Sequence, residues 1–407
     1  MNVAERYVKL VLAMGEHDAD YVDAYYGPPE WREAAKGRTL EDIREEAAAV
    51  IPSVSEGPGG AGGAPPAAPG PSLTLGVTLR RDYLSRQLEA LIARIDILQG
   101  KKLTFDQESK ALYDVVAPHH SEERFKALLA ELDGALPGSG PVAQRYESYR
   151  QRFVIPREKL DAVFSKAIAD ARARTLEHMA LPDGESFTVE YVNNKSWSGY
   201  NWYQGGYRSL IQVNTDLPIF IDRAIDLACH EGYPGHHVYN SLLEKTLVRE
   251  RGWIEFSVYA LFSPQSMIAE GSANYGIDLA FPGEERVAYE SRELFPLAGV
   301  DAGGAAQYYA TFALFSRLAY AGNEAARGYL DGSISAEQAV EWLVTYALMS
   351  PERARQRVRF FDQYRSYVIN YNLGRDLVAA YVERAGGERW AVFADLLSSP
   401  RLPSALV

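Results

Sequence analysis

The sequence is almost without cysteine, since only Cys229 among its 407 residues carries a thiol. One cysteine cannot form a disulfide within the chain, and it cannot supply the several thiolates of a cysteine-based zinc cluster. An uninterrupted apolar stretch of signal-peptide or membrane-spanning length is also missing, because charged residues break up the hydrophobic segments. We therefore expect a cytoplasmic protein that has no membrane partner.

The sequence also lacks an excess of basic residues, and its formal net charge is −12. Proteins that bind a phosphate backbone need clustered Lys and Arg to displace counterions, so we expect no nucleic-acid partner. Hydrophobic residues make up 47% of the chain, which is enough to fill a large core. The composition is that of a globular protein.

Composition and hydrophobic spacing divide the chain into four regions. Residues 1–51 are expected to form N-terminal helices, and residues 52–75 are so rich in Gly, Pro and Ala that we expect a flexible loop or linker. Residues 76–185 are expected to be helical and to form one wall of the molecule. Residues 186–407 are expected to form a metal-binding catalytic region.

The fold class expected from these patterns is mainly α, in the α+β sense, with one small antiparallel sheet. The sheet is expected between Ser186 and Asn214, where β-branched and aromatic residues alternate with glycine. Asp216 is expected to cap the helix that follows the sheet, and Ser263 with Pro264 to begin another. Helical periodicity predicts further helices over 78–99, 104–117, 121–135 and 156–180.

The residues that carry chemistry are three of the seven histidines, which fall within the segment HEGYPGHH at positions 230–237. A metal hydrolase needs neutral imidazoles and a carboxylate around the ion, with one position left open for water. Glu231 follows His230 directly, and this is where the general base stands in a HExxH helix. The segment therefore predicts a metal site with Glu231 as the base.

The spacing of these histidines departs from HExxH. Residues six apart in a regular helix are rotated by about 240°, so His230 and His236 could not share an ion there. However, Pro234 must clash with the carbonyl of His230, and Gly235 supplies conformational freedom. We expect the backbone to bulge and to bring His236 back beside His230. His237 remains the alternative ligand.

The third ligand is expected to be an acidic residue on a separate helix, and Glu270 in SPQSMIAEGSANYG fits this role. It stands among apolar residues, and the small residues at 271–273 let two helices approach closely. The alternative is an exposed glutamate on a polar helix face.

Three other positions near the motifs are weaker candidates for a role in the site, and Cys229 is expected to be structural. Tyr367 and Tyr371 are candidate donors to the oxyanion that develops during hydrolysis, with core packing as the alternative for each. Asp226 is either a partner for a ligand imidazole or a solvated helix residue. Cys229 is expected to be a small buried hydrophobe.

HExxPGHH, followed by an EGxA segment and by YVINYNLGRDL at 367–377, resembles the bacterial domain of unknown function 885 family. That family is similar to the gluzincin metallopeptidases, and the lengthened motif is also similar to that of dipeptidyl-peptidase III. The resemblance covers roughly residues 187–380. It implies a cleft-containing gluzincin-like architecture, with His230, His236 and Glu270 as zinc ligands and Glu231 as the base.

The sequence thus predicts a zinc metallopeptidase that holds one Zn²⁺ per chain and hydrolyses a peptide or small amide substrate. We expect the substrate to lie extended against the strand at 207–214, which leads into the metal-binding helix. The alternative for this strand is that both of its edges are already paired within the small sheet. The alternative to a peptidase is a non-catalytic helical protein that keeps the motif as a structural or vestigial metal site. A di-iron carboxylate bundle is excluded, because no histidine has a glutamate three residues before it. The oligomeric state is left open.

Overall fold

The computed structural model describes residues 2–56, 71–195 and 197–407, and these residues are mostly helical. The helices of the first half are α1 (Val3–Gly15), α2 (Glu30–Ala35), α3 (Leu40–Glu56), α4 (Pro71–Leu98), α5 (Phe105–Tyr113), α6 (Glu122–Ala135), α7 (Val142–Arg150) and α8 (Leu160–His178).

The helices of the second half include the two that flank the histidine segment. They are α9 (Asp222–Leu227), α10 (His236–Leu243), α11 (Pro264–Ala280), α12 (Gly283–Ala298), α13 (Ala305–Ser316), α14 (Ala321–Leu330), α15 (Ala336–Tyr346), α16 (Pro351–Tyr364), α17 (Ile369–Ala385) and α18 (Arg389–Leu397).

Short 3₁₀ and π segments connect many of these helices. They are η1 (Gln151–Phe153), η2 (Arg157–Lys159), η3 (Ala228–Gly232), η4 (Glu244–Arg249), η5 (Ile254–Ser257), η6 (Ala302–Gly304), η7 (Arg365–Val368) and η8 (Pro403–Leu406). Of these, η3 and η4 are π-helical turns.

The strands form two small sheets. β1 (Val22–Tyr25) pairs antiparallel with β5 (Val258–Ala260), and β2 (Ser186–Val192), β3 (Gly199–Gly205) and β4 (Arg208–Asn214) form a three-stranded sheet in the order β2-β4-β3. β3 and β4 run antiparallel, as expected, whereas β2 runs parallel to β4. The mainly α fold with a small sheet before the histidine segment is confirmed, and that sheet is mixed.

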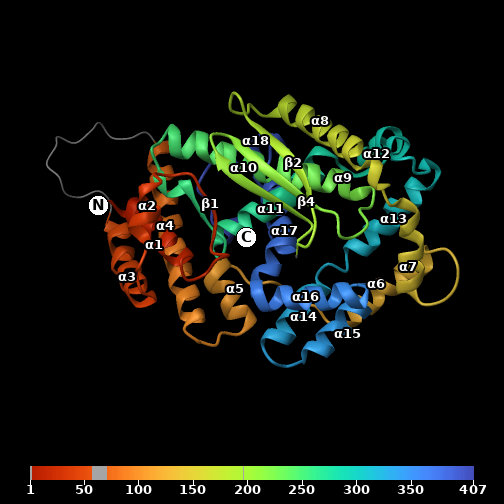
Figure 1. Ribbon diagram of the computed structural model, residues 1–407, viewed down its shortest axis with the longest axis horizontal. Helices are drawn as coiled ribbons and strands as arrows, with labels where there is room; N and C mark the ends of the chain where they lie inside the picture. The colour runs from red at the N-terminus through yellow and green to blue at the C-terminus, as the bar shows by residue number, and fades with distance from the viewer. Residues whose placement is uncertain (1, 57–70, 196) are drawn as a thin grey trace.

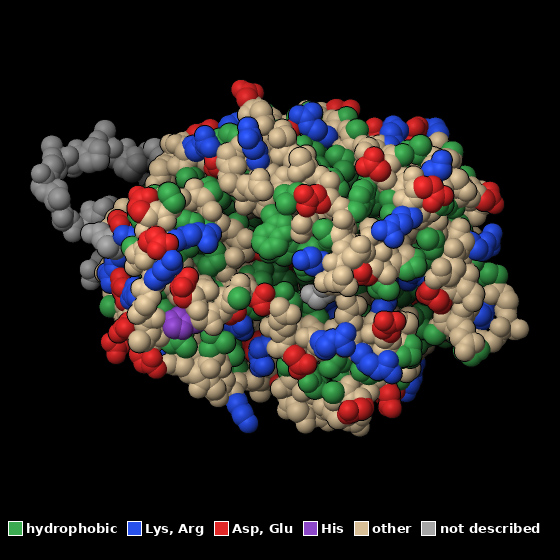
Figure 2. Space-filling view, in the orientation of Figure 1, with side chains coloured by type: hydrophobic (Ala, Val, Ile, Leu, Met, Phe, Trp, Pro, Cys, Tyr) green, Lys and Arg blue, Asp and Glu red, His purple; other side chains and the backbone are tan. Residues whose placement is uncertain are grey.

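Figure 1 shows an elongated molecule in which α1–α4 lie at one end and α6, α7 and α13–α16 lie toward the other. The sheet with β2 and β4 lies beside α10, while α11 and α17 run through the middle. Figure 2 shows this face hollowed near its centre, between the positions of β1 and α17 in Figure 1. Hydrophobic side chains floor the hollow, and charged side chains stand on its rim.

The two central helices touch through glycine. A Cβ atom on Gly271 of α11 would lie 2.5 Å from the backbone of Gly374 in α17, and one on Gly374 would lie 2.8 Å from the carbonyl oxygen of Met267. Side chains at these positions would push the helices apart. The close helix approach expected from the small residues after Glu270 is confirmed, and it brings the residues of α17 beside those of α11.

Several local expectations are wrong. The flanks of the 52–75 segment are helical, because α3 continues through Pro52 to Glu56 and α4 already begins at Pro71. Burial of Val50 and Val54 against the core favours this continuation of α3 despite the proline. Residues 57–70 lie outside the described residues. The strand β1 within residues 1–51 and the helix α7 were not expected.

The helix after the sheet also begins later than expected. Asp216 does not cap it, and its carboxylate instead accepts hydrogen bonds from the backbone of Asn194 (2.7 Å) and Lys195 (3.3 Å). The helix α9 starts at Asp222. By contrast, α11 begins at Pro264 after Ser263, as the sequence predicts. In the parts of the chain that the structure describes, no helix combines the length and the apolar character that crossing a membrane requires.

Candidate metal centre

The histidine segment is bulged. The helix α9 continues into the π-helical turn η3, leaves helical geometry at Tyr233, and re-enters it at His236 in α10. The peptide bond between Tyr233 and Pro234 is cis. A Cβ atom on Gly235 would lie 2.0 Å from the carbonyl oxygen of His230, so only glycine fits at this position. The expected bulge is confirmed.

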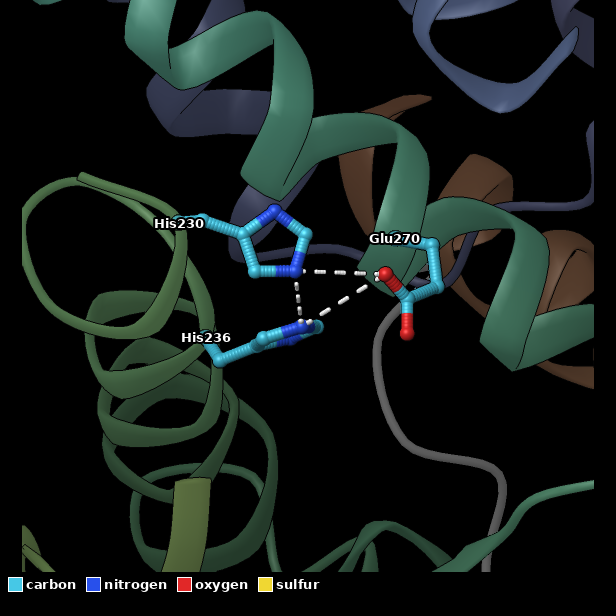
Figure 3. A group of neighbouring side chains, drawn as sticks. All are labelled: His230, His236 and Glu270. Carbon is cyan, nitrogen blue, oxygen red and sulfur yellow. Dashed lines mark hydrogen bonds and ion pairs between the residues drawn. The ribbon is translucent and has the colours of Figure 1, made fainter. Parts of the chain in front are cut away.

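The bulge brings His236 beside His230, and both face Glu270 on α11. The two Nε2 atoms are 3.2 Å apart, and Glu270 Oε2 lies 3.3 Å from His230 Nε2 and 3.8 Å from His236 Nε2. Figure 3 shows the two imidazole rings approaching the carboxylate from one side, with their planes 86° apart. One ligand atom from each residue lies within 4.8 Å of the others, so the group could hold a metal ion.

These separations suit a tetrahedral ion. Ligand atoms that stand about 2.0–2.1 Å from a tetrahedral metal are about 3.3 Å from one another. Glu270 Oε2 is also buried without a hydrogen-bond partner, although buried carboxylate oxygens are normally satisfied. A cation between the three side chains would satisfy it. The His230 and His236 side chains keep 15% and 12% of their surface exposed, so the group can be reached from solvent.

The electrostatics of the group also favour a cation. Burial alone lowers the pKa of His236, but the close carboxylate of Glu270, together with the charges of Glu231 and Asp23, raises it to about 9. Burial alone would raise the pKa of Glu270, but the close imidazoles of His230 and His236 and their positive charge hold it well below its usual range. A positive charge at this point is therefore stabilised, and a bound metal would replace the proton on His236.

Asn274 orients His230, and sequence reasoning missed it. Its amide nitrogen donates to the carbonyl oxygens of Glu270 (3.1 Å) and Tyr371 (3.2 Å), so its oxygen faces His230 Nδ1 at 3.2 Å. The Nδ1 atom of His230 must therefore carry the proton, which leaves the Nε2 lone pair for a metal. The spacing of Asn274, four residues after Glu270 on one helix face, was a usable signal.

The two candidate tyrosines both lie close to Glu270. The Tyr367 hydroxyl donates to Glu270 Oε1 at 2.8 Å, so Tyr367 orients the carboxylate. The Tyr371 ring lies 5.8 Å from that of Tyr367, and its hydroxyl has no hydrogen-bond partner among the described side chains. Burial, with the charge of Glu270, raises the pKa of Tyr371 well above its usual range. The hydroxyl therefore stays protonated and free to donate.

Glu231 is buried in the π-helical turn, and the adjacent strand β3 makes room for its carboxylate. A Cβ atom on Gly199 would lie 2.9 Å from Glu231 Oε1, and Asn201 donates to the backbone oxygen of Glu231 at 2.7 Å. The carboxylate is close enough to His236 to raise the pKa of that imidazole. Glu231 thus stands beside the metal group without belonging to it.

His237 points away from the group. Its Nε2 lies 2.9 Å from Glu185 Oε2, its Nδ1 lies 2.9 Å from Ser209 Oγ, and its side chain is fully buried. Glu185 also accepts hydrogen bonds from Tyr233 and Arg172. Burial alone would raise the pKa of Glu185, but its contacts with His237, Tyr233 and Arg172 lower it. His237 therefore connects the bulge to the sheet, and it is His236 that belongs to the group that could hold a metal ion.

Asp23 is a second residue that sequence reasoning missed. It lies on β1, accepts a hydrogen bond from the Tyr200 hydroxyl, and is close enough to His236, Glu270 and Glu231 to interact with their charges. Burial raises the pKa of Asp23 to about 6, although the hydrogen bond from Tyr200 opposes this. More than 200 positions separate Asp23 from His236, so spacing in the sequence gave no signal.

Two other sequence expectations concern the helix before His230. Asp226 is not solvated and does not contact His230, because it is buried in ion pairs with Arg286 (2.9 Å) and Arg223 (3.2 Å). Cys229 is fully buried, as expected, and burial raises the pKa of its thiol. Neither residue joins the metal group.

The expectation that substrate adds to the strand at 207–214 is wrong. β4 is the central strand of its sheet, and both of its edges are already paired, with β2 on one side and with β3 on the other. Its backbone donors and acceptors are therefore not available to a peptide. The alternation of side chains was visible in the sequence, but the order of the strands was not.

Comparison with known proteins identifies structures of similar fold but no family to which the chain could be assigned. Models of known protein families do not match this chain, and neither do curated proteins. Two solved structures have the same overall fold over 93% of the chain. One is a candidate lipoprotein from Colwellia psychrerythraea (TM-score 0.52, 16% identity), and the other is a candidate lipoprotein of unknown function from Shewanella oneidensis (TM-score 0.51, 13% identity).

These two proteins are longer than this chain. The chain spans 64% of the length of the Colwellia protein and 75% of the Shewanella protein. At such low identity the likeness concerns the fold alone.

Proposed function

We propose that this chain is a zinc-dependent peptidase that hydrolyses peptide or small amide bonds. The observation that carries the proposal is the convergence of His230, His236 and Glu270 beside Glu231, across a bulge that brings distant helical positions together. The resemblance of the HExxPGHH and EGxA segments to the domain of unknown function 885 family, and through it to gluzincins, supports the same function.

Zinc is the metal that suits these ligands best. Two imidazole nitrogens and one carboxylate favour Zn²⁺ over Mg²⁺ and Ca²⁺, which prefer oxygen ligands. Among the described residues the group has three members, which is the number that a catalytic zinc site takes from the protein. When bound, the ion would polarise a substrate carbonyl and make a water molecule more acidic.

The side chains around the group have separate roles. Glu231 accepts the proton of the attacking water, since its carboxylate is adjacent to the group and is not a ligand. Tyr371 donates its hydroxyl proton in a hydrogen bond to the oxyanion that develops on the substrate. Tyr367 and Asn274 hold Glu270 and His230 in place and act as positioning residues.

The alternative is a non-catalytic protein in which the same group is a structural or vestigial metal site. Structural zinc sites are normally closed by a fourth protein ligand, and the one cysteine of the chain is buried outside the group. The exposed surface of both histidines and the protonated Tyr371 favour a reactive site over a structural one. The cytoplasmic location expected from the sequence remains a prediction.

Glu231→Gln tests the proposal. The variant should keep the metal content of the wild type, measured on protein purified without added zinc, because Glu231 is not a ligand. It should lose at least two orders of magnitude in turnover of a peptide library, since a general base typically contributes that much. Chelation should abolish the wild-type activity, and zinc should restore it.

The matched control is Glu250→Gln, which removes a carboxylate from an exposed position outside the site. It should match the wild type in both metal content and turnover. Glu231→Gln protein that retains full activity would refute the role of Glu231. Wild-type protein that holds one zinc but cleaves no peptide would favour the non-catalytic alternative.

A further inference from the structure

Arg357 is a half-buried cation close to the metal group. It lies on α16, with its guanidinium 4.5 Å from the ring centroid of Phe360 and 6.0 Å from that of Tyr371. Its Nε atom is buried without a hydrogen-bond partner. Arginine normally satisfies such a buried donor with a carboxylate or a carbonyl oxygen.

The lack of a partner is unexpected in this chain. Acidic residues outnumber basic ones by 54 to 42, and other partly buried arginines do have partners, as in the pair of Arg365 with Glu108 at 2.6 Å. Over the described ranges, no carboxylate lies within 4.0 Å of the Arg357 guanidinium. A buried charge without a counter-ion is unfavourable, and burial lowers the pKa of Arg357 accordingly.

A second arginine extends this cationic surface. Arg353 lies one turn before Arg357 on α16, is also half-buried, and has a pKa that burial and the nearby Arg150 lower. In the part of the chain that the structure describes, Arg353 has no ion pair either. We call Arg353 and Arg357 the α16 arginines. Figure 2 shows basic side chains on the rim of the central hollow.

Tyr371 connects the α16 arginines to the reaction site. Its hydroxyl is close enough to Glu270, Arg357 and Glu231 for all three charges to act on it. Tyr371 also contacts Tyr367, whose hydroxyl binds Glu270. Arg357 and Glu270 thus both act on Tyr371, which places the guanidinium within reach of a substrate residue held at the metal group.

We propose that Arg357 binds a carboxylate of the substrate, so that the preferred substrates carry a free carboxylate near the amide bond that is cleaved. The inference rests on the proposed peptidase function and specifies its substrate class. A guanidinium pairs with a carboxylate through two parallel hydrogen bonds, which fixes both the position and the direction of the substrate. The carboxylate is either the C-terminal group of a peptide or the side chain of an internal Asp or Glu.

The test uses three N-acetylated peptides. Two share one uncharged sequence and end in a free carboxylate or in an amide, and the third is amidated and differs from the second only by a Glu next to the cleaved bond. Wild-type kcat/KM should be about 10- to 100-fold higher for the peptide whose carboxylate Arg357 binds than for the amidated peptide without Glu. The first peptide reports a terminal carboxylate, and the third reports a side-chain carboxylate. Equal rates on all three would overturn the proposal.

Arg357→Gln should remove most of the preference, chiefly through KM, while Arg357→Lys should retain part of it. Arg359→Gln removes an exposed arginine from the same helix and should keep the full preference. The melting temperature of Arg357→Gln protein should not fall, because the cation lost has no internal counter-ion. A preference that survives in Arg357→Gln protein would refute the role of Arg357.

Binding separates this inference from the proposed function. Calorimetry on zinc-loaded Glu231→Gln protein measures the affinity for the same peptides without turnover. Tighter binding of a carboxylate peptide, lost in the Glu231→Gln/Arg357→Gln double variant, would support carboxylate binding by Arg357 even if the wild type cleaved none of the three peptides. Equal binding of all three, or no binding, would overturn it.

Discussion

His236 and His237 are adjacent in the chain but have different surroundings. His236 faces His230 and Glu270, whereas His237 is buried between Glu185 and Ser209. We predict that His236→Ala abolishes metal binding, because one of three ligands is lost. His237→Ala should keep the metal but lower the free energy of unfolding by roughly 1–3 kcal/mol, because Glu185 and Ser209 lose a buried partner.

Metal analysis and urea unfolding of the two variants distinguish these outcomes. Stoichiometric zinc in His236→Ala protein would show that the ligand has been wrongly assigned. His236 and His237 also show how much of the site could be predicted from the sequence. The bulge and the preference for His236 followed from Pro234 and Gly235, whereas the role of His237 depends on Glu185 and Ser209, which come from other segments.

Asn274 offers a finer test at the same scale. Because its amide oxygen fixes the tautomer of His230, Asn274→Ala should weaken zinc affinity by about 10- to 100-fold without removing a ligand. Asn274→Asp keeps an acceptor for the Nδ1 proton and should lose less affinity. A competition titration with a zinc chelator measures both. Equal affinities for Asn274→Ala and the wild type would contradict the orienting role.

At the scale of elements, the contact between α11 and α17 sets the position of the tyrosines relative to Glu270. Gly374→Ala places a Cβ atom 2.8 Å from the carbonyl oxygen of Met267, so the two helices must separate. We predict a loss of roughly 1–3 kcal/mol in stability together with reduced turnover. Thermal unfolding and peptide hydrolysis measure these effects.

Gly322→Ala on α14 is the control for a helical glycine, because apart from its chain neighbours and its own helix backbone no atom lies within 4 Å of the added Cβ. That variant should be neutral or more stable than the wild type, since alanine favours helix. If both alanine variants behave alike, the contact between the two glycines has no special role.

A second element-scale prediction concerns α12, where Glu290 is fully buried beside Arg286 and Tyr309. Burial raises the pKa of Glu290 to about 7, although Arg286 and Tyr309 oppose the rise. The folded protein holds the proton of Glu290 more tightly than the unfolded chain does, so protonation of Glu290 stabilises the fold. This stabilisation is complete below the unfolded pKa near 4.5 and is lost as pH rises through the folded pKa of about 7. The wild type should therefore lose stability between pH 5.5 and 8.

Glu290→Gln should remove roughly 1–2 kcal/mol of this pH dependence, because glutamine does not titrate. The measurement is urea unfolding across that range, with Glu284→Gln, at an exposed position of the same helix, as the control. A pH dependence that is unchanged in Glu290→Gln protein would contradict the raised pKa. The sequence did not predict this cluster, since Arg286 of α12 links Glu290 to Asp222 and Asp226 of α9 only in the folded chain.

At the scale of the whole molecule, the metal group joins α11 to the bulge between α9 and α10. A ligand that binds only the folded state stabilises it, so chelation should lower the melting temperature by a few degrees, and one equivalent of zinc should restore it. Differential scanning calorimetry with and without chelator measures the shift. His236→Ala protein should show no shift, and a shift of equal size there would point to metal bound elsewhere.

The sequence predicted the fold class because periodicity and composition are local properties. The start of α11 and the bulge after His230 also followed from local chemistry at Ser263 and Pro234. The position of β4 in the middle of its sheet and the pairing of β1 with β5 depend on contacts between separate segments, and the approach of Arg357 to Tyr371 depends on how the chain turns between α16 and α17. No local pattern encodes such contacts.

The pairing of β1 with β5 has a consequence for synthesis of the protein. Asp23 leaves the ribosome first, the metal ligands follow more than 200 residues later, and the α16 arginines and Tyr371 emerge last among these residues. A growing chain therefore cannot assemble the complete site before Tyr371 has emerged. If the protein is the peptidase we propose, this order of emergence keeps each nascent chain inactive toward neighbouring polypeptides until residue 371 has been made.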